Sequence, residues 1–234
     1  MRLFFIALCV ARLGAAVMAQ GAPVREKEPP PPQTKPEAVA PPLKRNARPA
    51  EVEAGAKPEP FDKATPEQMS KQCVTLATEE GAIEIEMLAE AAPESVRNFL
   101  NLSASGAYDT TVFSRVVRGF VIQGGDLHTR EKITVELARR AARKLPDEPS
   151  AVKHVRGVVS MARGEEPGSA TTHFFILAGD GPHLDGTFAA FGRVRAGMDV
   201  VDKINGAEIE GEKPKKPVRV TRATVAPCPA PLPD

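Results

Sequence analysis

The chain has 234 residues, a formal net charge of +1 and 42% hydrophobic residues. This near-neutral balance gives no basis for charge-driven binding to nucleic acid or to a membrane surface, and the hydrophobic fraction is sufficient for a substantial core. The 23 prolines and the uneven spread of apolar residues predict one globular domain joined to a non-globular part.

Residues 1–19 have the pattern of a secretory signal peptide. Arg2 precedes an apolar stretch from Leu3 to Val10, and Val17-Met18-Ala19 fits a small-x-small cleavage site. The apolar stretch is short and is followed by Arg12, so a stable membrane-spanning helix is not expected. We expect export with cleavage, to the periplasm or cell envelope, and an uncleaved anchor is the alternative.

Residues 20–68 are rich in Pro, Ala, Lys and Glu, and Phe61 is the only aromatic residue among them. Such a segment cannot bury enough apolar surface to offset the entropy lost on ordering. We therefore predict a disordered, semi-extended linker with polyproline character. A docking tract for a Pro-binding module is the alternative.

The globular part is predicted over residues 69–228, followed by a flexible tail at 229–234. Residues 74–88 read as two strands around a Glu-Glu-Gly turn, because Ile83 and Ile85 alternate with glutamates. A helix is predicted over residues 93–104, with Pro93 in its first turn.

Short strands dominate the rest of this part. Strands are predicted at residues 111–117, 120–125, 157–162, 173–179, 189–194 and 217–227. A second helix is predicted over residues 197–206, with Gly206 as its C-cap. Many strands and little helix predict an antiparallel barrel or sandwich capped by helices. Residues 127–152 have helical composition but fall between strands, so a long, partly ordered excursion is expected there.

Several chemistries lack support in the sequence. No Cys or carboxylate is spaced with His173 and His183 as zinc sites require, so these histidines are predicted to line a pocket or lie at the surface. There is no Gly-x-Ser-x-Gly motif of a serine hydrolase. Gly124-Gly125 is too short for a dinucleotide or phosphate loop, and Asp126 is predicted to form a turn.

Two long motifs carry a family resemblance. "FSRVVRGFVIQGGD" (113–126) and "HVRGVVSMARGEEPGSATTHFFILAGDGPHLDGTFAAFGRV" (154–194) closely resemble signatures of the cyclophilin family of peptidyl-prolyl cis-trans isomerases. The similarity runs over residues 74–226, in the order that the family has. It implies a mainly β fold, a closed eight-stranded antiparallel barrel capped by two helices.

The resemblance assigns the catalytic role to Arg115. Rotation about an X-Pro bond breaks amide resonance and crosses a barrier of about 20 kcal/mol. The prolyl nitrogen regains a lone pair in the twisted state, so a fixed donor placed there stabilises the transition state selectively. Arg stays protonated and offers several directed donors. The alternative is a structural arginine paired with a carboxylate.

The resemblance also implies a set of substrate-binding residues: Phe120, Val121, Gln123, Ala162, Arg163, His173, Phe175, His183, Leu184 and Phe188. Spacing alone would favour core packing for the apolar members, and the motif match favours a pocket for the proline ring. Gln123 is expected to orient Arg115 and to bind the substrate backbone. The family commonly has Met at position 121, Asn at 163 and Trp at 183, so this site departs from its relatives.

Two cysteines, Cys73 and Cys228, remain after cleavage and lie at the two ends of the globular part. An even pair in an oxidising compartment suggests a disulfide, which requires the first and last strands to be neighbours. In the family fold these strands are adjacent and antiparallel, so the resemblance makes a Cys73–Cys228 bond geometrically sensible.

We therefore predict an exported bacterial isomerase that assists the folding of exported proteins. It is expected to be a monomer that acts on proline-containing polypeptides, without a metal, cofactor or nucleic acid. Intact Arg115, Phe120 and Gln123 favour catalysis. The alternative is a non-catalytic proline-peptide-binding module or scaffold. The site residues that differ from the family pattern and the long linker favour this alternative.

Overall fold

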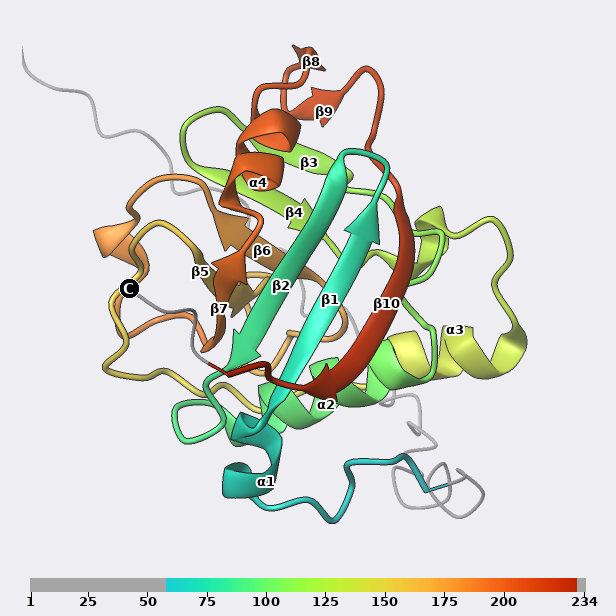
Figure 1. Ribbon diagram of the computed structural model, residues 1–234, viewed down its shortest axis with the longest axis vertical. Helices are drawn as coiled ribbons and strands as arrows, with labels where there is room; N and C mark the ends of the chain where they lie inside the picture. Colours follow the sequence, from blue (N-terminus) through green and yellow to red (C-terminus); the bar gives the residue numbers. More distant parts are fainter. Residues whose placement is uncertain (1–57, 231–234) are drawn as a thin grey trace, which may run out of the picture. The chain divides into compact units, whose positions relative to one another are not determined.

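The computed structural model describes residues 58–230, so the predicted signal peptide, most of the linker and the end of the tail lie outside it. Eight strands form one sheet (Figure 1): β1 Gln72–Thr78, β2 Gly81–Met87, β3 Arg115–Val117, β4 Val121–Gly124, β5 Val158–Met161, β6 Phe174–Leu177, β7 Ala190–Ala196 and β10 Val220–Pro227. A separate two-stranded hairpin consists of β8 Ile209–Glu210 and β9 Lys213–Pro214. Each predicted strand is present, although the one at 111–117 is much shorter than expected.

The eight strands follow the order β10-β1-β2-β7-β5-β6-β4-β3, and every neighbouring pair is antiparallel. The predicted closed barrel is wrong, because β3 and β10 remain edge strands and the sheet is an open half-barrel. The gap is crossed by an isolated bridge between Val112 and Arg219, by nearby backbone hydrogen bonds, and by a hydrogen bond from the Arg219 side chain to the Thr110 carbonyl at 2.6 Å. Thr110, the residue before the predicted strand at 111–117, has a φ of 63°, outside the extended region.

Two of the helices were predicted from the sequence. α2 (Pro93–Ala104) has the predicted bounds, and α4 (Met198–Asn205) ends at the predicted C-cap, Gly206. They lie at opposite ends of the sheet in Figure 1. Within residues 58–230, no helix is long and apolar enough to cross a membrane.

The end of the predicted linker packs against the sheet and α2. α1 (Pro66–Ser70) begins with a capping box formed by Thr65 and Gln68, and it buries Met69. Asn101 Oδ1 of α2 accepts a hydrogen bond from the Phe61 backbone at 2.8 Å. The folded domain therefore begins before the predicted boundary at residue 69, because capping and a few specific contacts order a segment whose composition is mostly polar.

Two apolar clusters lie on the two faces of the sheet. The inner one includes the rings of Phe99, Tyr108, Phe174 and Phe191, with centroid separations of 4.9 to 5.5 Å. We name the other the outer cluster; its buried members are Val121, Val158, Phe175, Leu177, Leu184 and Ala190. Every residue of β5 and β6 is buried, which explains why these strands read as continuous apolar runs rather than as alternating ones.

The excursion at residues 127–152 contains a 3-10 helix, η1 (Leu127–Thr129), and a short helix, α3 (Val135–Ala141). Its last part is irregular but makes specific contacts with α2. The carboxylate of Glu148 accepts backbone hydrogen bonds from Glu94 at 2.8 Å and Ser95 at 2.7 Å. These are N–H groups of the first helical turn, which have no partner within the helix. The excursion therefore caps the start of α2.

A disulfide joins Cys73 of β1 to Cys228, which follows β10. β1 and β10 pair antiparallel with Cys73 opposite Ala226, and the Cys228 N–H donates to the Lys71 carbonyl at 2.9 Å. Neighbouring first and last strands thus bring the two cysteines together, as the resemblance implies.

Candidate active site

The predicted site is built on the outer face of β3, β4 and β6. Arg115 lies opposite Gln123, and Gln123 lies opposite Phe175. Residues directly opposite each other in antiparallel strands project from the same face of a sheet. The three side chains therefore form one row that crosses the sheet.

Arg115 is 42% exposed and is held by two partners. Its Nε donates to Glu212 Oε2 at 2.6 Å and its Nη2 donates to Glu212 Oε1 at 3.2 Å. Its Nη1 donates to Gln123 Oε1 at 3.3 Å, as expected for a residue that orients Arg115. The carboxylate pair that was the structural alternative for Arg115 is thus present. No sequence pattern identified Glu212, which lies 97 residues away in the chain.

The turn between β3 and β4 is fixed by the last residue of α4. Asn205 donates to the carbonyls of Val117 at 2.9 Å and Val121 at 3.1 Å, and its Oδ1 accepts from the Gly119 N–H at 2.7 Å. These bonds satisfy the turn's polar groups and hold its two strands. The predicted helix at 197–206 therefore positions the strand pair that carries Arg115.

The outer cluster gathers most of the apolar residues predicted to bind proline. Val121, Phe175 and Leu184 are buried members, and Phe120, Ala162 and Phe188 are partly buried and pack against them. Val117, two residues from Arg115 and on the same face of β3, also packs there and lies opposite Val121. The arginine and an apolar surface therefore adjoin on one face of the sheet.

Polar side chains lie beside this cluster. The His183 ring is tilted against Phe120 with centroids 5.3 Å apart. The guanidinium of Arg163 lies 5.1 Å from the centroid of the Phe188 ring, which is a cation–π arrangement. Arg163 Nε is also 3.9 Å from Asp147 of the excursion. The excursion thus contributes a charge beside the site.

His173 lies just before β6, two residues from Phe175. Its Nε2 lies 3.8 Å from Asp126 Oδ1, and burial lowers the pKa of its ring, so the imidazole is neutral near pH 7. Asp126 accepts a hydrogen bond from the His128 N–H at 2.9 Å and caps η1, in agreement with its predicted role in a turn.

A buried polar network of His154, Ser160 and Asp185 contacts the loop that carries Leu184. His154 Nδ1 lies 3.2 Å from Asp185 Oδ1, and His154 Nε2 lies 3.0 Å from Ser160 Oγ. The backbone N–H of His154, followed by Lys153, lowers the pKa of Asp185 to about 2. This arrangement resembles a hydrolase triad, but Ser160 is 0% exposed and no substrate could reach it. The network therefore positions the loop.

Replacing His154 with alanine is expected to lower the free energy of unfolding by about 2 to 3 kcal/mol, because it leaves the buried Ser160 hydroxyl unpaired and opens a cavity. Urea unfolding monitored by circular dichroism measures this loss. Ser160→Ala is the control, and it should cost less because it removes one hydrogen bond and little volume. A loss below about 0.5 kcal/mol for His154→Ala would show that the network is dispensable.

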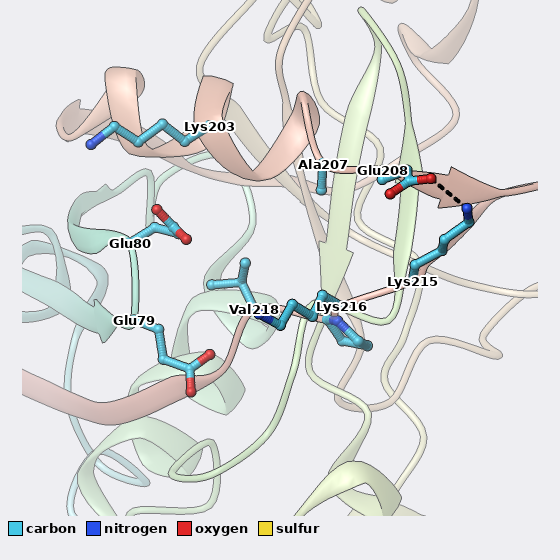
Figure 2. Close-up of a pocket in the computed structure, with 9 residues that line it drawn as sticks. Glu79, Glu80, Lys203, Ala207, Glu208, Lys215, Lys216 and Val218 are labelled. Atoms are coloured by element: carbon cyan, nitrogen blue, oxygen red, sulfur yellow. Dashed lines mark hydrogen bonds and ion pairs between the residues drawn. The ribbon is translucent and has the colours of Figure 1, made fainter.

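A second hollow lies away from this site, between the β1–β2 turn, the end of α4 and the base of the β8–β9 hairpin (Figure 2). Its lining includes the carboxylates Glu79, Glu80 and Glu208 and the amines Lys203, Lys215 and Lys216. Such a mixed-charge surface offers little apolar area for a proline ring. The outer cluster is therefore the better candidate for substrate binding.

Comparisons with known proteins show the family to which the chain belongs. A sequence model described as "Cyclophilin type peptidyl-prolyl cis-trans isomerase/CLD" matches residues 73–225. The chain is 38% identical over 158 residues to peptidyl-prolyl cis-trans isomerase cypE of Dictyostelium discoideum, covering 67% of this chain and 99% of that protein. It is 37% identical over 168 residues to peptidyl-prolyl cis-trans isomerase B of Escherichia coli K12, covering 65% of this chain and 99% of that protein.

A solved structure supports the fold. The crystal structure of a Cryptosporidium parvum cyclophilin-type isomerase, obtained in the presence of the dipeptide Ala-Pro, matches with a TM-score of 0.58 at 28% identity. The match covers 66% of this chain and 98% of that one. The sequence model, the relatives and the structure agree, and the chain therefore belongs to the cyclophilin-type peptidyl-prolyl cis-trans isomerase family.

Proposed function

We propose that this protein accelerates cis–trans isomerisation of X-Pro bonds at its outer cluster, with Arg115 as the catalytic residue. The observation that carries the proposal is the row of Arg115, Gln123 and Phe175 beside an apolar surface on one face of the sheet. A directed donor next to an apolar surface is the combination that a twisting prolyl bond requires.

The chemistry needs no covalent step. The proline ring packs against the outer cluster, where Phe120 and Leu184 supply apolar contacts. An N–H of Arg115 donates to the prolyl nitrogen once the amide twists and that nitrogen becomes pyramidal. The planar amide nitrogen accepts poorly, so this hydrogen bond favours the transition state over both ground states.

The cellular role that we propose is assistance to the folding of exported proteins. Two features support export: the signal-peptide pattern of residues 1–19, and a disulfide of the kind that persists in oxidising compartments. Chain isolated from its host with residues 1–19 attached and both thiols free would rule out this role, and the isomerase activity would be unaffected by that result.

Exchange spectroscopy on a short X-Pro peptide tests the isomerase activity directly. Uncatalysed rotation takes tens of seconds, so the cis and trans resonances of the peptide alone should show no exchange cross-peaks. We expect these cross-peaks to appear when a substoichiometric amount of the protein is added. Peptide that binds, as judged by shifted resonances, without exchange would favour the alternative of a proline-peptide-binding module. Neither binding nor exchange would contradict both functions.

A further inference from the structure

We propose that Glu212 is a positioning residue that holds the Arg115 guanidinium in its catalytic orientation. This inference rests on the proposed function of Arg115. Glu212 forms a two-point contact with one edge of the guanidinium, through Nε at 2.6 Å and Nη2 at 3.2 Å. A bidentate contact of this kind sets the plane of the group as well as its distance.

Glu212 is itself held in place by its backbone. Its carbonyl accepts a hydrogen bond from the Val116 N–H at 2.8 Å, next to Arg115 on β3. Glu212 is the second residue of the β8–β9 turn, and the first is Gly211 with a φ of 61°. Glycine adopts this left-handed conformation without the strain that another residue would incur. The turn therefore delivers the carboxylate to the edge strand β3.

The base of the same hairpin is closed by a second pair of contacts. Lys215 donates its backbone N–H to the Glu208 carbonyl at 2.8 Å, and its side-chain amine pairs with the Glu208 carboxylate (Figure 2). The hairpin is thus tied at its base, and it is tied at its turn through Val116 and Arg115. A segment fixed at both ends can set the direction of a side chain that it binds.

The remaining hydrogen-bonding capacity of Arg115 fits this role. A guanidinium has five N–H donors. Glu212 takes the one on Nε and one on Nη2, and Gln123 Oε1 takes one on Nη1. Among contacts within residues 58–230, this leaves one donor on each terminal nitrogen. Those two are free for the substrate, and their directions are set by the three bonds already made.

The ion pair between Arg115 and Glu212 is largely at the surface. Its effect on the orientation of Arg115 can therefore be separated from an effect on the stability of the fold. The side chains of Arg115 and Glu212 are 42% and 55% exposed. Exposed ion pairs contribute little to stability, and the Val116 backbone bond does not depend on the side chain at position 212. We therefore expect the Glu212→Ala variant to fold normally, while its Arg115 guanidinium is no longer held in one orientation.

The test compares Glu212→Ala, Glu212→Gln and the control Glu210→Ala in the full chain. Glu210 lies on the same hairpin, is exposed, and makes no ion pair within residues 58–230. We expect Glu212→Ala to lower kcat by about tenfold with KM changed by less than about twofold, because loss of orientation weakens the transition-state contact. Glu212→Gln should lie between, since its amide oxygen can still accept one hydrogen bond. Glu210→Ala should match the unaltered chain.

A spectroscopic measurement reports the orientation itself. The side-chain ¹H–¹⁵N resonance of Arg115 Nε should be shifted and protected from solvent exchange in the unaltered chain and in Glu210→Ala. In Glu212→Ala it should move and exchange rapidly. An unchanged resonance would show that other contacts orient Arg115.

The outcomes separate this inference from the proposed function. Activity that falls in Arg115→Ala but stays at the unaltered level in Glu212→Ala overturns the positioning role and leaves the isomerase intact. Activity that rises in Glu212→Ala also overturns it, since the carboxylate would then compete with substrate for the guanidinium. Absence of isomerisation by the unaltered chain would instead contradict the proposed function.

Discussion

Replacing Arg115 with alanine is expected to lower kcat/KM for an X-Pro peptide by about 100-fold or more. Removal of one preorganised donor that bonds to developing charge typically costs this much in other enzymes. The donor here acts on a nitrogen lone pair that exists only in the twisted state, so the loss should appear mainly in kcat. The outer cluster is unchanged by the substitution, and peptide binding should be largely retained.

Arg118→Ala is the matched control for this measurement. Arg118 lies three residues further along, at the β3–β4 turn, and donates to the Ala207 carbonyl at 3.1 Å. Its removal takes away the same charge from the same hairpin without touching the row of Arg115, Gln123 and Phe175. Equal losses in the two variants would attribute the effect to general electrostatics, and the catalytic assignment of Arg115 would fail.

Loss of the disulfide is expected to have the largest effect on stability. Cys73 and Cys228 are separated by 155 residues, and closing a loop of that size removes conformational entropy from the unfolded chain worth about 5 kcal/mol in the loop-entropy model. Cys228→Ser should therefore lower the free energy of unfolding by up to about this amount. The native fold retains the β1–β10 ladder in the variant, so the isomerase site should still form at low denaturant concentration.

Urea unfolding of the unaltered chain, with and without a reductant, measures this effect. Reduced protein should unfold at a lower urea concentration, close to that of the Cys228→Ser variant, whose own midpoint should not respond to reductant. Alkylation provides an independent check of the bond. Labelling of both thiols in the absence of reductant, or identical unfolding midpoints in all samples, would contradict a disulfide that stabilises the fold.

The fold follows from the sequence where its determinants are local. α2 begins at Pro93 and ends near Gly106, because a helix start and stop are properties of neighbouring residues. The β1–β2 hairpin follows from alternation around a Glu-Glu-Gly turn. α1 was not predicted, and β3 is shorter than the predicted strand at residues 111–117. α1 follows a segment that Asn101 of α2 holds through the Phe61 backbone, and a contact between residues 40 positions apart is not visible in the local sequence.

Most of the candidate site was also predictable, for a different reason. Phe120, Phe175 and Leu184 each look like ordinary core residues from their spacing, and only the two long motifs marked them as a set. The structure gathers them in the outer cluster, on the opposite face of the sheet from the main core. The roles of these residues in binding stay predictions until the exchange and mutational experiments are done.

By itself, the sequence determined the family, the order of the strands along the chain and the helices α2 and α4, and it predicted a set of site residues. Only the tertiary structure decided that the sheet stays open between β3 and β10, and that Glu212 meets Arg115. Both concern segments about 100 positions apart in the chain: Val112 meets Arg219 in an isolated bridge rather than in a continuous ladder, and Arg115 meets Glu212 in an ion pair. Local propensity and periodicity describe only neighbouring residues. Whether two distant residues meet depends on how all the elements between them fold and pack.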